Sequence, residues 1–142
     1  EWILNEDLFE PIRPLVAGGM VANQGMMKMA VELLLLKIEQ EKEFYTRAIR
    51  MEGPVQFSDI ALKVTQQFLI EVIQDMVGDK KPKHPWLTAE VVSLYYAQSM
   101  CFIMTEWLKM GMPYSPEEMA EAYKYIMSRS LDDVIAEMKQ TI

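Results

Sequence analysis

The amino-acid sequence predicts an all-α fold, and three observations lead to that class. Apolar residues recur at intervals of three and four in each long segment, breaks rich in Gly and Pro separate these segments, and no stretch shows the alternation of a strand. A chain of 142 residues that is 51% hydrophobic can enclose one sizeable core. We therefore expect residues 1–142 to form a single helical domain.

The first fifty residues predict a short helical piece, a turn and then a long helical region. Prolines and the pair Gly18-Gly19 interrupt the opening, where four apolar side chains are expected to act as anchors: Trp2, Leu4, Leu8 and Phe9. Helical spacing then runs from about Met20 to Met51, and the charged cluster Glu39 to Glu43 suggests a break into two helices. Gly53-Pro54 ends this region.

The segment from Phe57 to Met76 predicts the next amphipathic helix. Its apolar face consists of residues at helical spacing, namely Ile60, Ala61, Val64, Phe68, Val72 and Met76. Residues 78–85 (GDKKPKHP) then combine Gly, Pro and Lys with the only histidine. This composition is typical of a solvated connection and argues against regular structure.

Two N-terminal capping signals mark the helices of the second half. Thr88 is expected to cap a long helix that reaches about Met110 and ends at Gly111. Residues 115–118 (SPEE) supply a capping Ser, a Pro at the first helical position and a Glu that completes a capping box. An amphipathic tail from Leu131 to Met138 follows a bend near residues 128–130.

The long helix after Thr88 is apolar around most of its circumference. On a helical wheel Gln98, Thr105 and Lys109 form one narrow polar stripe, and the remaining arc is too broad for a single neighbouring layer. One interpretation is a central core helix of a monomeric bundle. The other is a helix with one flank against a partner subunit and the other against an internal cavity. The thirteen methionines suit both core filling and a pocket for apolar ligands.

The charge balance and the single cysteine exclude several classes of protein. With 21 acidic and 14 basic residues, the net charge of −7 would repel a phosphate backbone, so this segment itself is not expected to bind DNA. The sequence has no uninterrupted apolar run of about 18 residues, so it predicts no membrane span. Cys101 alone cannot form an internal disulfide, which suits a reducing compartment. We expect a cytoplasmic protein.

The residues that catalysis or metal binding would need are scarce. His84 lies in the Lys- and Pro-rich connection, where a solvated side chain is expected rather than a general base. Cys101 on its apolar helix is expected to be an inert thiol. The pairs Glu117-Glu118 and Asp132-Asp133 suit helix N-termini. We therefore expect no enzyme activity, no metal site and no cofactor.

Two segments resemble the C-terminal regulatory domain of the bacterial TetR-family repressors. Residues 43–53 (EFYTRAIRMEG), with Phe57 after them, are similar to that family's helix end, glycine break and aromatic start of the next helix. Residues 102–111 (FIMTEWLKMG) and 115–118 (SPEE) are similar to its penultimate helix, ending in Trp-Leu-x-x-Gly, and to the start of its final helix. The likeness covers roughly residues 25 to 127.

The resemblance implies a homodimer in which the helices at about 88–110 and 116–127 pair with their copies in a four-helix bundle. Six residues are expected at that interface: Tyr95, Phe102, Trp107, Met119, Tyr123 and Ile126. It also implies a cavity among the preceding helices for an apolar or amphipathic small molecule. Seven residues are expected to line it: Met26, Met29, Phe44, Phe68, Tyr96, Met100 and Met104.

In that family the regulatory domain follows a DNA-binding head. The chain begins with Glu1 rather than Met, so we expect it to be part of a longer product, with a helix-turn-helix head upstream that binds operator DNA. Ligand binding would then release the DNA, as in a repressor. The alternative is a helical dimerising scaffold domain that binds no ligand.

Overall fold

The computed structural model describes residues 5–12, 24–50 and 56–140 of the chain, and within them it contains helices and no strand. The prediction of an all-α fold is therefore confirmed. Two short elements, the π-helical turn η1 (Asn5–Phe9) and the 3-10 turn η2 (Glu10–Ile12), come first. Six α-helices follow: α3 (Gln24–Gln40), α4 (Lys42–Arg50), α5 (Phe57–Val77), α6 (Ala89–Lys109), α7 (Pro116–Met127) and α8 (Leu131–Gln140).

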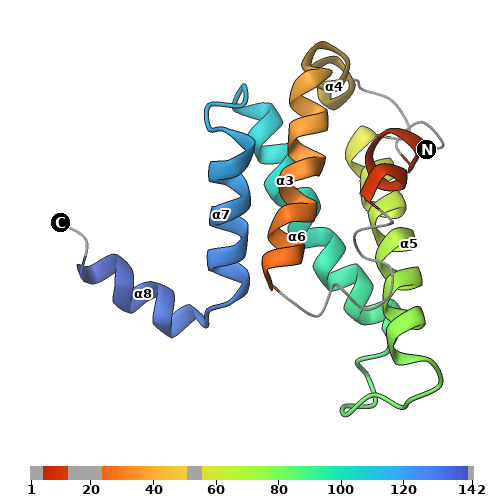
Figure 1. Cartoon of the computed structure of the whole chain (residues 1–142). Helices are drawn as coiled ribbons and strands as arrows, with labels where there is room; N and C mark the ends of the chain where they lie inside the picture. The colour runs from red at the N-terminus through yellow and green to blue at the C-terminus, as the bar shows by residue number, and fades with distance from the viewer. Residues whose placement is uncertain (1–4, 13–23, 51–55, 141–142) are drawn as a thin grey trace.

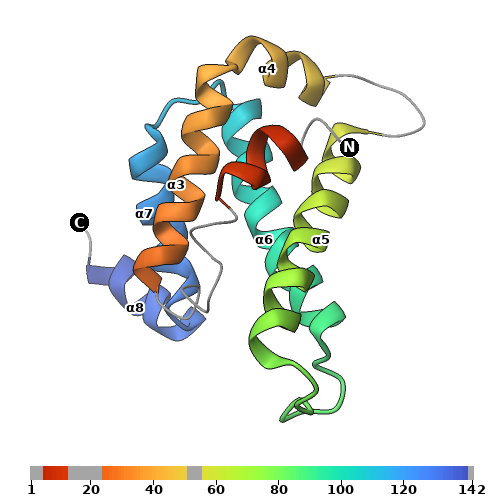
Figure 2. The ribbon, with the colours of Figure 1, turned by 45° about the vertical axis from the view of Figure 1, so that its right-hand side comes forward.

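Two antiparallel helix pairs make up the body of the domain (Figure 1). α5 packs along α6, and α3 packs along α7, so each pair joins helices that run in opposite directions. α4 lies across one end of the bundle, and α8 turns away from the body at the other end (Figures 1 and 2). The long connection between α5 and α6 is exposed over residues 78–88, as its composition predicted.

Side-chain caps fix the starts of α6 and α7 where the sequence predicted them. The Val91 N–H donates to Thr88 Oγ1 over 3.3 Å, which satisfies one of the free donors of the first turn. At α7 the Glu118 N–H donates to Ser115 Oγ and the Ser115 N–H donates to Glu118 Oε1, each over 3.1 Å. The capping box is therefore complete.

The end of α6 requires an unusual backbone conformation at two successive residues. Gly111 has a φ of 85° and Met112 a φ of 56°, both in the left-handed region. The Met112 N–H donates to the Trp107 carbonyl over 2.8 Å, which closes the last turn. The predicted glycine stop is confirmed, and the reversal directs the chain into α7.

The core contains side chains from every element of the body, and its largest fully buried members are Trp107, Tyr45, Ile38 and Leu108. The predicted anchors Leu8 and Phe9 are also buried, and the Phe9 ring lies 4.9 Å from that of Phe68. Trp2 and Leu4, the other predicted anchors, lie outside the described residues. The opening segment therefore covers the α3–α5 side of the core through Leu8 and Phe9.

The predicted break inside the second helical region is confirmed at Glu41, between α3 and α4. Tyr45 follows it and is fully buried, with the rings of Phe44 and Phe57 at 5.0 and 6.1 Å. An aromatic group therefore connects the start of α4 to the start of α5.

The polar stripe predicted for α6 is wrong at one of its three positions. Gln98 and Lys109 are exposed, but Thr105 is buried. Its hydroxyl donates to the Cys101 carbonyl four residues earlier over 2.8 Å, so the buried hydroxyl has a hydrogen-bond partner. Thr105 belongs instead to a buried row of small side chains at intervals of four: Ser93, Ala97, Cys101 and Thr105.

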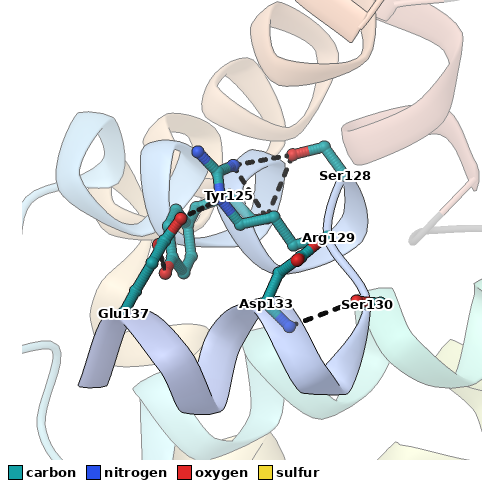
Figure 3. Close-up of polar contacts among 6 residues, drawn as sticks. All are labelled: Tyr125, Ser128, Arg129, Ser130, Asp133 and Glu137. Atoms are coloured by element: carbon teal, nitrogen blue, oxygen red, sulfur yellow. Dashed lines mark hydrogen bonds and ion pairs between the residues drawn. The ribbon is translucent and has the colours of Figure 1, made fainter. Parts of the chain in front are cut away.

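α8 is joined to α7 by polar contacts (Figure 3). The Tyr125 hydroxyl donates to Glu137, and Arg129 Nε donates to the same carboxylate over 3.1 Å while its guanidinium lies 4.1 Å from the centre of the Tyr125 ring. The Asp133 N–H donates to Ser130 Oγ and caps the new helix. None of the residues of α8 is buried, so its apolar side chains face solvent.

Candidate functional site

The described residues enclose two separate hollows between the helices, and the inner one is very small. It has a volume of about 30 Å³, enough for one or two water molecules and too little for an organic ligand. Its walls come from η1, α3, α5, α6 and α7 and include Phe9, Leu34, Ile38, Ala61, Thr65, Met100, Met104 and Tyr123. The side chains around this hollow are therefore closely packed.

The outer hollow is a half-open groove of about 320 Å³. α5 supplies one apolar wall, α6 and α7 supply the other, and α3 contributes a single lysine. The described lining residues are Lys28, Leu69, Val72, Ile73, Met76, Val92, Tyr96, Tyr123, Lys124 and Met127. Its volume falls at the lower end of the range of small-molecule sites, roughly 300–1,000 Å³, and its mostly apolar lining is typical of them.

Lys28 and Glu121 form an ion pair beside this groove and connect α3 with α7. The Lys28 Nζ lies 2.5 Å from Glu121 Oε1. The hydrogen bond between them raises the pKa of the Lys28 amine and lowers the pKa of the Glu121 carboxyl. Both groups are therefore charged at neutral pH.

Tyr123 forms a wall shared by the two hollows, since it lines both of them. Its side chain is buried, and its hydroxyl lies 3.4 Å from Ser99 Oγ on α6. Burial raises the pKa of the Tyr123 phenol, so the hydroxyl keeps its proton at neutral pH. Because the Ser99 hydroxyl donates to the Tyr96 carbonyl over 2.8 Å, the Tyr123 hydroxyl is the donor in this longer contact.

The seven residues predicted to line a ligand cavity are distributed over several places. Met100 and Met104 line the inner hollow, and Tyr96 lines the groove. Phe68 is buried against Phe9. The remaining three lie elsewhere: Met29 and Phe44 are nearly half exposed and line neither hollow, and the side chain of Met26 is outside the described residues.

The six residues predicted at a dimer interface also divide into two groups. Tyr95 and Phe102 on α6 are 67% and 63% exposed, and Ile126 on α7 is more than half exposed. Met119 is half-buried. Trp107 and Tyr123 are enclosed within the chain, and the Trp107 indole N–H donates to the Tyr114 carbonyl over 2.8 Å. These last two side chains therefore support the interior of the domain.

The sequence did not predict that residues of α5 line the groove, nor that Lys28 and Lys124 do so. Leu69, Val72 and Ile73 look like ordinary core residues of an amphipathic helix, and Lys28 looks like an ordinary surface lysine. No sequence signal distinguishes a residue that faces a neighbouring helix from one that faces a groove. The pairing of α5 with α6 and of α3 with α7 makes that distinction.

The structure places the cysteine Cys101 and the histidine His84 in different surroundings, one inside the domain and one on its surface. Cys101 is buried, its Sγ donates weakly to Thr65 Oγ1 at 3.5 Å, and burial raises its pKa, so it stays a protonated thiol. His84 is exposed in the connection before α6.

Within the described ranges, no three His, Cys, Asp or Glu side chains are grouped so as to hold a metal ion. Each described helix falls short of the length and apolar character that a membrane span requires.

Comparison with known proteins identifies the family. Residues 27–129 match the TetR-family model described as the transcriptional regulator C-terminal region. The match extends from α3 through α7, including the groove, and ends just before α8. No curated protein and no solved structure matches the chain significantly. Because the family model covers well over half of the sequence, the chain belongs to the TetR family of transcriptional regulators and contains the C-terminal regulatory region of that family.

Proposed function

We propose that this region senses a small apolar or amphipathic molecule, which binds in the groove between α5, α6 and α7. The observation that carries the proposal is the groove itself, with about 320 Å³ of space and walls such as Leu69, Ile73 and Met76. The inner hollow of about 30 Å³ could not admit such a molecule without movement of the helices.

We also propose a homodimer formed through α6 and α7. Tyr95 and Phe102 lie seven residues apart on one side of α6, and Ile126 lies one turn after Tyr123, whose hydroxyl adjoins Ser99 on α6. Exposed aromatic and aliphatic side chains on adjoining helices support an interface, because such residues are enriched at the centres of protein contacts. We name Tyr95, Phe102 and Ile126 the α6–α7 apolar face.

Regulation would follow from a shift between two arrangements of the dimer. A ligand between α5 and α7 changes the position of α7, and α3 packs along α7, so α3 moves with it. A helix-turn-helix head before this region, in a cytoplasmic repressor, would then lose its fit to operator DNA. The coupling is reciprocal, so the DNA-bound dimer holds the ligand more weakly.

The test of the sensor function uses a neutral apolar dye, 1-N-phenylnaphthylamine, whose fluorescence rises in apolar sites. We expect saturable binding to the chain and its loss in Ile73→Trp, because the larger ring fills the groove. Met110→Trp, which adds the same ring at an exposed position outside the groove, should bind the dye normally. Equal dye binding by both variants would contradict the proposal.

The second candidate is a helical scaffold domain that dimerises and binds no ligand. The small size of the inner hollow favours it, because a sensor with an enclosed cavity would leave more space. A chain that forms dimers in analytical ultracentrifugation but shows no saturable dye binding would support this alternative.

A further inference from the structure

The charged side chains that line the groove are both basic, and the nearest carboxylate described beside it, that of Glu121, is paired with one of them. Lys28 from α3 and Lys124 from α7 contribute to its lining, and no acidic residue does so within the described part of the chain. This is unexpected in a protein with a net charge of −7, whose average field would attract cations. An apolar groove with two ammonium groups is complementary to a molecule with an apolar body and a negative end.

The two lysines differ in their present partners. Lys28 is bound to Glu121, as described above, while no carboxylate of the described residues lies within 4.0 Å of Lys124 Nζ. The Lys28 side chain is 21% exposed and that of Glu121 is 58% exposed. Glu121 can therefore turn into solvent at little cost, and the Lys28 ammonium group would then be free to pair with another anion. A ligand carboxylate could supply that partner.

Two tyrosine side chains belong to the same groove. Tyr96 and Tyr123 both line it. The hydroxyl of Tyr123 donates to Ser99 Oγ over a long 3.4 Å, a hydrogen bond that a closer carboxylate would replace. A bound carboxylate accepts several hydrogen bonds at once, so a site that combines ammonium and phenol donors suits it better than it suits a neutral or cationic group.

We infer that the groove takes a single-chain amphipathic carboxylate, whose apolar chain lies along the α5 wall of Leu69, Ile73 and Met76 and whose carboxylate replaces Glu121 on Lys28, with Lys124 beside it. This inference rests on the proposed function and names the chemical class of its ligand. It also gives the ligand a direct mechanical effect, because the ion pair that it breaks joins α3 to α7. A neutral apolar molecule in the same groove would leave that connection intact.

The test compares three probes of equal chain length by isothermal titration calorimetry on the 142-residue chain: octanoate, 1-octanol and octyltrimethylammonium. Octanoate should bind about tenfold or more tightly than 1-octanol, since a hydrogen bond to a charged group contributes roughly 1.5–3 kcal/mol and 1.4 kcal/mol corresponds to tenfold. Octyltrimethylammonium should bind most weakly. Equal or tighter binding of either competitor would overturn the inference.

Variants assign the effect to particular residues. Lys28→Met should weaken octanoate binding about tenfold and leave 1-octanol binding within about twofold, which also shows that the variant is folded. Lys124→Met should act in the same direction, and Glu121→Gln should tighten octanoate binding by removing the competing carboxylate. Lys109→Met, an exposed lysine on α6 outside the groove, is the matched control and should change nothing.

The outcomes separate this inference from the proposed function. If octanoate and 1-octanol bind equally and Ile73→Trp abolishes both, the groove is a ligand site without preference for an anion, and only the inference fails. If no probe binds, both the inference and the sensor function fail. If octanoate binds but is unaffected by Lys28→Met and Lys124→Met, the lysines do not hold the carboxylate and the inference is overturned.

Discussion

The two sides of α6 differ in a way that reverses the usual expectation for an amphipathic helix. Along most of its length the side that faces the core has a row of small or hydroxylated buried residues, Ser93, Ala97, Cys101 and Thr105. The large buried residues Trp107 and Leu108 follow only at the C-terminal end of the helix. The opposite side has the large rings of Tyr95 and Phe102, which are more than 60% exposed. In a helix that belonged only to a monomeric core, the larger apolar residues would be the buried ones.

The difference agrees with the two kinds of contact that we propose for this helix, one within the chain and one with a second copy. Small side chains allow α5 and α6 to approach closely along the buried row, as the contact between Cys101 and Thr65 illustrates. The large rings on the other side cannot contribute to that packing and remain available for a partner. This pattern supports the dimer that we propose, and it makes separate predictions for each side of the helix.

The largest expected effect is at Trp107, which is fully buried within the chain. Trp107→Ala should lower the free energy of unfolding by about 3–5 kcal/mol, because it removes a large packed ring and leaves a cavity. Urea denaturation measures this change. Phe102→Ala, compared under conditions in which the chain is monomeric, should change the same quantity by less than about 0.5 kcal/mol. Similar losses in both variants would remove the distinction between the two sides.

The second prediction concerns the close packing of the buried row. Ala97→Leu should lower the free energy of unfolding by about 1–3 kcal/mol, because the added carbons have no space between α5 and α6. Gln98→Leu at the neighbouring exposed position is the control, with an expected change within about 0.5 kcal/mol. A neutral Ala97→Leu variant would show that the two helices can separate easily.

The third prediction concerns the α6–α7 apolar face. Phe102→Ala should raise the dimer dissociation constant about tenfold, since truncation of an aromatic residue central to an interface costs more than about 1 kcal/mol. Sedimentation equilibrium gives this constant, and Tyr95→Ala should act in the same direction. Lys139→Ala on α8, outside this face, serves as the control. An unchanged constant in both α6 variants would locate any dimer contact elsewhere.

The smallest effect is a dependence of stability on pH that arises from two buried groups, Cys101 on α6 and Tyr123 on α7. Burial raises the pKa of the Cys101 thiol above its ordinary value of 9.0, and that of the Tyr123 phenol above 10.0. Below about pH 9 both groups are protonated in the folded and unfolded chain, so stability is complete. Above about pH 9 the two groups lose their protons more readily in the unfolded chain than in the folded one. The free energy of unfolding should therefore fall by at most about 1.4 kcal/mol per pH unit for each group.

Urea denaturation at a series of pH values from 8 to 11 checks this prediction. Cys101→Ala should flatten the decrease just above pH 9, where the thiol contributes first, although the variant is less stable at every pH. A decrease of the same steepness in the variant and the parent chain would show that the thiol is not responsible.

The sequence predicted the helices well because their boundaries depend on local chemistry. The Thr88 cap, the Ser115–Glu118 capping box and the Gly111 stop each involve residues within one helical turn. The break between α3 and α4 and the bend before α8 were predicted for the same reason. The family could also be predicted from the sequence, because its motifs are short segments around these helix boundaries.

The candidate site was less predictable because it depends on residues from four helices. Met100 and Met104 were predicted for a ligand site and lie together, but in a hollow too small for a ligand. Among the described residues predicted for the ligand cavity, Tyr96 lines the groove, while the lysines and the α5 wall were not identified. Periodicity shows that a side is apolar, but it does not show what covers that side.

The sequence by itself therefore determined the all-helical class, the order and ends of the helices and the membership of the TetR family, because local hydrogen bonding and short motifs carry that information. Only the tertiary structure decided that Trp107 and Thr105 lie inside, that Tyr95 and Phe102 lie outside, and that Lys28 meets Glu121 beside the groove. The physical reason is that burial and ion pairing depend on how closely separate helices approach, and the small residues of α6 set that approach.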